Sequence, residues 1–125
     1  MLTYTLPGMP LIYSGQEAVN TRRLEFFERD PIRFKDRSRA PLYTRLSAFK
    51  HAHPALAAGE AGGDLRILTT GNDDLFAFRR VKGSDVITVV VNLSYHPVSV
   101  PSAQGLGGGR LAPGGWRVVS RGKPL

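Results

Sequence analysis

Cysteine is absent from the 125 residues of the chain. This absence excludes a disulfide framework, a thiol nucleophile and a zinc site built on cysteine. Long apolar runs are absent too, since the apolar start of the chain has no basic flank and is interrupted by Pro7 and Pro10. The start is therefore neither a signal peptide nor a membrane-spanning helix. We expect no membrane partner, and no compartment is assigned beyond a slight preference for the cytoplasm.

Acidic residues are scarce. The 17 Lys and Arg outnumber the 10 Asp and Glu, which gives a formal net charge of +7. A surplus of this kind is typical of proteins that meet nucleic acids or anionic surfaces. The most basic stretch, residues 22–50, is however interrupted by carboxylates, and no nucleic-acid-binding motif accompanies it. We expect no nucleic-acid partner, and a basic interaction protein unrelated to sugars stays open as one alternative.

The first part of the chain, residues 1–53, has the pattern of a single βα unit. A short apolar run at residues 9–13 predicts a buried strand, because both of its faces are apolar. The charged stretch at residues 16–37 predicts a long ordered loop. A helix is predicted over residues 38–52, with an apolar stripe at helical spacing formed by Leu42, Leu46 and Phe49.

From residue 54 the pattern changes to short runs rich in β-branched residues, separated by turn residues. These runs predict strands at residues 65–70, 75–81, 86–93, 96–100 and 116–120. The run at residues 86–93 is the most apolar and is expected to be central. Short strands joined by tight turns predict an antiparallel β-sandwich over residues 54–125.

One run, from Pro7 to Glu17, reads PGMPLIYSGQE. It resembles the stretch at the eighth strand of the (β/α)8 barrel in the α-amylase family of glycoside hydrolases. Residues 23–32 are similar to the loop after that strand in bacterial members, and residues 42–56 to the last barrel helix and the start of the C-terminal domain. The resemblance implies a mainly β chain, an amylase-type C-terminal β-sandwich preceded by one βα unit left over from a barrel.

The chemistry of that family is missing from this chain. Retaining glycoside hydrolysis needs two carboxyl groups about 5 Å apart, and the resemblance implies that they lie on earlier barrel strands. We therefore assign no catalytic residue, no metal ligand and no cofactor, and we expect no hydrolysis by the chain alone. The expected role is structural support within an α-glucan-active glycoside hydrolase.

The implied partner is an N-terminal catalytic barrel of the same protein, with α-glucan as a further candidate ligand. Without that barrel, residues 9–13 and the stripe on the predicted helix are apolar surfaces that lack a cover. We expect them to be disordered, to self-associate or to refold onto the sandwich.

Ser14, Gln16 and Glu17 follow the predicted strand at its carboxyl end, which is the face where barrel enzymes build their active sites. Within a full enzyme we expect them to line or brace the rim of the sugar site. In the β-domain, Tyr95 and Trp116 are candidates for stacking on a sugar ring, although a core or edge position is favoured for Trp116. Such a platform would make the domain a carbohydrate-binding module, which stays open as the second alternative.

Two further patterns carry little weight. His51 and His53 have no additional ligand at metal-binding spacing, so surface histidines at the end of a helix are expected. Asn92-Leu93-Ser94 matches the pattern for N-glycosylation, but a pattern this short is frequently matched by chance.

Overall fold

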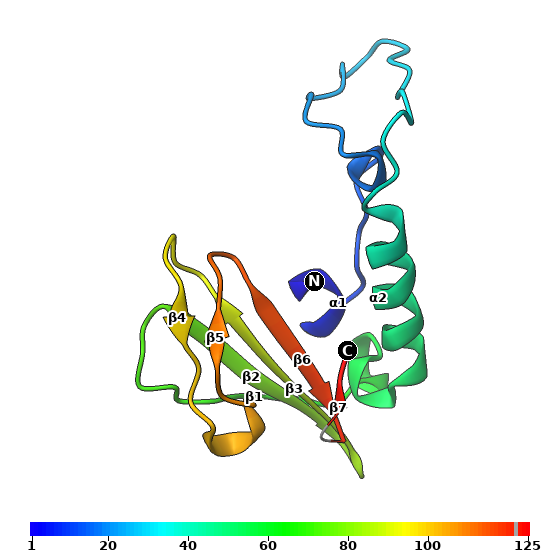
Figure 1. The fold of residues 1–125 in the computed structure, drawn as a ribbon. Coiled ribbons are helices and arrows are strands. Elements are labelled where there is room, and N and C mark those ends of the chain that lie inside the picture. Colours follow the sequence, from blue (N-terminus) through cyan, green and yellow to red (C-terminus); the bar gives the residue numbers. More distant parts are fainter. Residues whose placement is uncertain (122) are drawn as a thin grey trace.

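The centre of the molecule is a five-stranded antiparallel sheet in the order β1-β2-β3-β6-β7. The computed structural model describes residues 1–121 and 123–125. The strands of this sheet are β1 (Asp64–Ile67), β2 (Leu75–Lys82), β3 (Asp85–Asn92), β6 (Trp116–Ser120) and β7 (Lys123–Pro124). A second, two-stranded sheet pairs β4 (Val98–Ser99) with β5 (Arg110–Leu111), as Figure 1 shows.

Strand β3 is the central strand of the larger sheet, as its β-branched composition predicts. It pairs with β2 over the whole length of both strands, from Leu75 opposite Asn92 to Lys82 opposite Asp85. Its other edge pairs with β6. The two-residue turn between β2 and β3 places Gly83 at a φ of 57°, a conformation that glycine adopts without strain. This hairpin is the framework on which the other layers pack.

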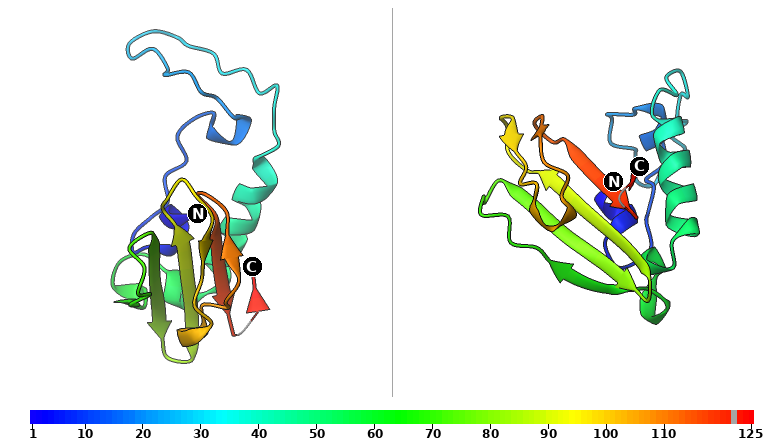
Figure 2. Two further views of the ribbon diagram at one scale, coloured as in Figure 1. Left: turned by 60° about the vertical axis from the view of Figure 1, so that its left-hand side comes forward. Right: turned by 60° about the horizontal axis from the view of Figure 1, so that its bottom comes forward.

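Alternating side chains of the sheet bury two separate cores. On one face, Phe78, Ile87, Val89 and Val118 pack with the helical segments around residues 55–56. On the opposite face, β2 and β3 pack against the small sheet and the loop that joins its two strands; this core contains Leu75, Ala77, Val90, Val98, Val100, Leu106 and Leu111. The sheet therefore lies between a helical layer and a small β layer (Figure 2). The predicted fold class, mainly β and antiparallel, is confirmed.

The predicted helix is present as α2 (Ala40–Ala52), and a short helix α1 (Leu2–Thr5) packs beside it. Of the three outcomes expected for the stripe on α2, refolding onto the β-domain agrees with the burial of two of its residues. Leu46 is only 1% exposed, and Phe49 packs against the core on the helical face of the sheet. The sequence did not predict α1, and α1 together with the 3₁₀ turn Pro54–Leu56 fills the space beside the stripe.

The strand predicted at residues 9–13 is not formed. The segment is irregular, and Met9, Leu11, Ile12 and Tyr13 are exposed. A strand exists only when a neighbour satisfies its backbone groups, and no strand of the described residues pairs with this segment. Residues 9–13 therefore have the composition of a strand but do not form one in this structure.

The strand predicted at residues 96–100 is shorter than expected, with β4 limited to Val98–Ser99. Strands β5 and β7, each of two residues, were not predicted. No helix within the described residues is long and apolar enough to cross a bilayer.

Two cationic side chains, the buried Arg80 and the half-buried Lys50, fasten the N-terminal segment to the rest of the fold. The Arg80 guanidinium on β2 donates to the carbonyl oxygens of Thr5 at 3.1 Å and Gly63 at 3.2 Å. Lys50 Nζ on α2 donates to Gly8 O at 3.1 Å, to Tyr4 O at 3.5 Å and to Leu56 O. Neither cation forms an ion pair within the described part of the chain. Burial lowers the pKa of both groups, and the Arg80 charge lowers that of Lys50 further.

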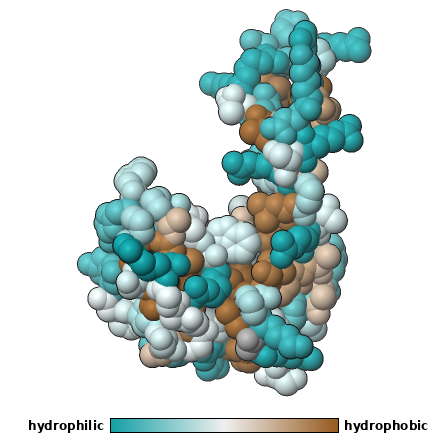
Figure 3. Space-filling view, in the orientation of Figure 1, coloured by the Kyte–Doolittle hydropathy of each residue, from teal (hydrophilic) through white to brown (hydrophobic). Residues whose placement is uncertain are grey.

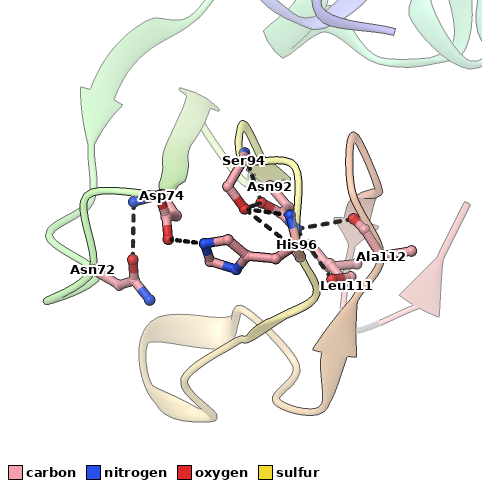
Figure 4. A network of polar contacts seen from close by, with 7 residues as sticks. All are labelled: Asn72, Asp74, Asn92, Ser94, His96, Leu111 and Ala112. Carbon is pink, nitrogen blue, oxygen red and sulfur yellow. Dashed lines mark hydrogen bonds and ion pairs between the residues drawn. The ribbon is translucent and has the colours of Figure 1, made fainter.

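The two sheets are joined by a buried amide at the end of β3 (Figure 4). Asn92 Nδ2 donates to the carbonyl oxygens of His96 at 2.7 Å, Ala112 at 3.0 Å and Leu111 at 3.2 Å. Its Oδ1 accepts from Ser94 N at 2.9 Å and from Ser94 Oγ at 2.7 Å. Because Asn92 is fully buried and its amide is fully used, it is not an accessible glycosylation site.

We expect Asn92→Asp to lower the free energy of unfolding by about 3–5 kcal/mol, because it places an unpaired carboxylate against three carbonyl oxygens. Asn72→Asp is the matched control: Asn72 is exposed and uses only its oxygen, which accepts from Asp74 N at 2.9 Å. That change is expected to stay within about 0.5 kcal/mol. Urea unfolding followed by circular dichroism measures both, and equal effects would contradict the role of the Asn92 amide.

Candidate functional site

An open hollow of about 600 Å³ lies between α2 and the residues that follow the exposed apolar segment. Its lining combines one carboxylate, several hydroxyl groups and an apolar wall: Ile12, Ser14, Glu17, Ala40, Tyr43, Thr44 and Ser47. Hydroxyl groups both donate and accept hydrogen bonds. The lining therefore suits a small polyhydroxylated ligand.

A tight turn at Gly15 builds one wall of this hollow. Gly15 is buried, with a φ of 90°, and an added Cβ would lie 2.9 Å from Asn20 Cβ. Its carbonyl oxygen accepts from Ala18 N at 3.0 Å and from Asn20 N at 2.9 Å. The turn leads into the 3₁₀ helix Gln16–Ala18, which contacts α2. Glycine is required here because a side chain would meet both strain and a steric clash.

The three predicted rim residues do not all share one environment. Ser14 and Glu17 line the hollow together. Gln16 is exposed, and its side-chain oxygen accepts from Tyr13 N at 3.1 Å, so it braces the turn. Glu17 Oε2 is buried and finds no hydrogen-bond partner among the described residues. A buried carboxylate oxygen needs a donor, and a hydroxyl group of a ligand or of another protein segment would supply one.

The loop after the hollow stands away from the sheet (Figures 1 and 2), and an ion pair closes its first part, residues 22–30. Arg22 and Asp30 pair side on, with one guanidinium nitrogen 2.6 Å from Asp30 Oδ2. The same Oδ2 accepts from Glu25 N at 2.9 Å. The hydrogen bonds from Arg22 and from the Glu25 backbone hold the pKa of Asp30 below its usual range. The alternation of acidic and basic residues in this loop predicts ion pairs that hold its shape, and the pair of Arg22 with Asp30 is one of them. Glu25 and Glu28 form no ion pair within the described residues.

The two candidate stacking residues lie in different settings. Tyr95, in the turn after β3, is 99% exposed, and no aromatic ring of the described residues packs on it. Trp116 is half-buried against the core on the helical face and lines a hollow between the sheet and the two helices. Its contacts are those of a residue at the edge of a core.

His53 is not a free surface histidine, which corrects the expectation from the sequence. Its Nδ1 lies 2.8 Å from Asp85 Oδ1, and Asp85 Oδ2 accepts from Ala55 N at 2.9 Å. His51 Nδ1 lies 2.8 Å from the carbonyl oxygen of Ser47. His53 thus joins the end of α2 to the start of β3. Within residues 1–121 and 123–125, no three His, Cys, Asp or Glu side chains gather in a metal-binding group.

No family model matches the chain. Among curated proteins, the chain is 36% identical over 89 residues to α-1,4-glucan:maltose-1-phosphate maltosyltransferase 2 of Streptomyces coelicolor, a match covering 70% of this chain and 13% of that protein. It is 29% identical over 119 residues to the α-amylase MalA of Haloarcula japonica, a match covering 91% of this chain and 17% of that protein. The chain thus spans less than a fifth of the length of both relatives.

Solved structures agree with the sequence matches. A maltogenic amylase from S. marinus superposes on 99% of this chain with a TM-score of 0.72 at 21% identity, over 19% of its own length. The cyclic α-maltosyl-(1→6)-maltose hydrolase of Arthrobacter globiformis, in its ligand-free form, gives a TM-score of 0.63 at 19% identity, over 99% of this chain and 28% of its own.

The fold, an antiparallel β-domain with a helical segment, is shared with these two enzymes. In sequence and fold the chain is similar to enzymes of the α-amylase family of glycoside hydrolases, and the similarity is consistent with the C-terminal β-domain of that family. The resemblance identified from the residues is confirmed, and an interaction protein unrelated to sugars has no support.

Because the pKa of Asp30 is lowered on folding, the stabilisation from its pair with Arg22 is present above the usual Asp pKa of about 3.9 and is lost as the pH falls through the lowered value. The Glu25 amide signal in NMR spectra should shift in that acidic range, and Asp30→Asn should produce the shift already at neutral pH. Asp36→Asn is the matched control, because Asp36 accepts from Ser38 N at 2.8 Å. It should move the Ser38 amide and leave that of Glu25 in place.

Proposed function

We propose that this chain is the C-terminal part of an enzyme that acts on α-1,4-linked glucans. In this proposal, residues 1–53 are the last strand, loop and helix of a (β/α)8 barrel, and residues 54–125 are a β-sandwich domain that supports it. The names of the curated relatives support the substrate class. The chain brings structural support and part of the rim of the sugar site, while the catalytic carboxylates lie in the partner barrel.

The exposed apolar segment is the observation that carries this proposal. Met9 and Leu11 are almost fully exposed although they stand in a run with the composition of a buried strand. In Figure 3, hydrophobic surface gathers where the helical segments meet the sheet, below a loop that is largely hydrophilic. Exposed apolar surface of this kind marks an interface, and a neighbouring barrel strand on each edge would both cover it and satisfy its backbone.

The rim residues support a place beside the substrate. Ser14 and Glu17 follow the apolar segment at its carboxyl end, where barrel enzymes assemble their sites. The unpartnered Glu17 Oε2 and the hydroxyl groups of Tyr43 and Thr44 line one hollow. In the complete enzyme these groups hydrogen-bond sugar hydroxyls or fix the loops that do so.

A carbohydrate-binding module is the second candidate, and the full exposure of Tyr95 favours it. In this case the β-domain holds glucan on its surface, with Tyr95 as the platform. Trp116 contributes less, because it is partly buried against the core on the helical face of the sheet.

The direct test is a chimera of the S. coelicolor relative in which the matching segment is replaced by this chain. We expect the chimera to be soluble and to transfer maltosyl units, whereas the relative truncated before that segment should be inactive. The purified chain alone should release no sugar from maltoheptaose. A soluble but inactive chimera, or turnover by the chain alone, would contradict the proposal.

Leu11→Asp in the chimera tests the place of the apolar segment. If the segment is a buried barrel strand, the charge should abolish folding or activity, since an unpaired buried charge is strongly destabilising. Leu93→Asp is the matched control, because Leu93 is exposed at the end of β3 in the β-domain. Equal activity of the two variants would disprove the proposal that residues 9–13 form a buried barrel strand.

The isolated chain should self-associate through the same segment. Sedimentation velocity is expected to show oligomers that dissociate when Met9 and Leu11 are both replaced by Ser, because the apolar contact area is lost. The corresponding double change at Leu65 and Ile67, exposed on edge strand β1, is the control. A monomer at all concentrations would disprove self-association.

A further inference from the structure

Two adjacent phenylalanines stand at the tip of the loop that follows the hollow. Phe26 and Phe27 are 81% and 92% exposed. Their rings meet edge to face, with centroids 4.6 Å apart and planes at 85°. Edge-to-face contact is a favourable geometry for an aromatic pair. The rings of Phe26 and Phe27 therefore stand nearly at right angles and form a corner with ring faces in two directions.

The surroundings of this corner are polar. A hollow of about 300 Å³ beside Phe26 is lined by Arg23, Leu24 and Glu25. Neither Arg23 nor Glu25 forms an ion pair within the described part of the chain. The guanidinium donates hydrogen bonds and the carboxylate accepts them, so both are available to a ligand that carries hydroxyl groups.

The residues on both sides of the corner are fixed by an ion pair. Asp30 binds Arg22 and the backbone of Glu25, so the residues on each side of the phenylalanines are held together. A segment ordered before its ligand arrives loses less conformational entropy on binding. The loop follows Ser14 and Glu17 of the rim hollow closely in the sequence.

We propose that Phe26 and Phe27, with Arg23 and Glu25, form a glucan-binding corner beyond the rim of the proposed sugar site. One face of a glucose ring exposes C–H groups and rests on an aromatic ring, while its hydroxyl groups meet the guanidinium and the carboxylate. An α-1,4-linked chain is curved, so two rings at right angles fit its successive units better than a flat strip does. This inference rests on the proposed action on α-glucans and adds residues that contact the substrate.

Packing against the absent barrel is the competing explanation for two exposed aromatic rings. A protein-packing contact buries apolar residues among apolar neighbours and leaves charged groups at the rim. Here an unpaired arginine and an unpaired glutamate share one hollow with Phe26, which favours a polyhydroxylated ligand over an apolar protein surface.

The test is an NMR titration of the full chain with maltoheptaose, followed through the ring signals of its phenylalanines. We expect saturable shifts at Phe26 and Phe27, and an affinity that falls about tenfold in Phe26→Ala or Phe27→Ala. Phe34→Ala is the matched control: Phe34 is an exposed ring in the same loop, beside Arg37. It should change the affinity less than about twofold, and unchanged signals from β3 establish that each variant is folded.

Several results would overturn the assignment. These are ring signals that do not move up to the solubility limit of maltoheptaose, an affinity unchanged by both alanine variants, or equal binding of cellohexaose, whose chain is β-linked and straight. Loss of solubility of the Streptomyces chimera on Phe26→Ala would assign the corner to packing against the barrel.

The chimera also separates this inference from the proposed function. An active chimera that shows no binding at the corner would disprove the glucan-binding corner and leave the proposed function intact. A soluble but inactive chimera, together with binding of maltoheptaose that depends on Phe26, would disprove the proposed place of residues 1–53 in a barrel. The corner would then stand as a sugar-binding site.

Discussion

The position of the whole N-terminal segment depends on two cations bound by main-chain carbonyl oxygens. Arg80 reaches from the sheet to Thr5, and Lys50 reaches from α2 to Tyr4, Gly8 and Leu56. These contacts satisfy carbonyl groups at the end of α1 and in the turn after it, which would otherwise be left without partners in a partly buried region. Because α1 is fixed in this way, the apolar segment that follows it leaves the domain in a defined direction, and the rim hollow forms between that segment and α2.

The sequence predicted those elements whose pattern is set by local rules. The hairpin of β2 and β3 is visible from its β-branched runs around Gly83, and α2 from the spacing of Leu42, Leu46 and Phe49. Residues 9–13 show the limit of such rules, because a strand forms only by pairing with another strand, and no described strand pairs with them. Strands β5 and β7 hold two residues each, too few to show a period, and the four-residue helix α1 is held by contacts with Arg80, Lys50 and the core that are distant in sequence.

The candidate site was predicted in part. The order of the residues placed Ser14 and Glu17 at the end of the apolar segment, and they share one hollow. The 3₁₀ turn directs Gln16 away from the hollow, and no periodic pattern in the sequence predicts such a turn. The corner at Phe26 was missed for a similar reason. An apolar pair inside a charged loop is consistent with either burial or exposure, and no periodic pattern in this loop distinguishes the two.

The buried amide of Asn92 has a consequence for making the protein in a foreign host. Asn92-Leu93-Ser94 is an acceptor pattern for oligosaccharyltransferase, an enzyme of the eukaryotic secretory pathway that acts on chains still unfolded. In the folded chain both atoms of the amide are enclosed between the two sheets. Sugar attached to Asn92 before folding would prevent β4 and β5 from closing over the larger sheet. Production through that pathway would therefore set glycan transfer and folding in competition for the same side chain, whereas bacterial expression avoids this competition.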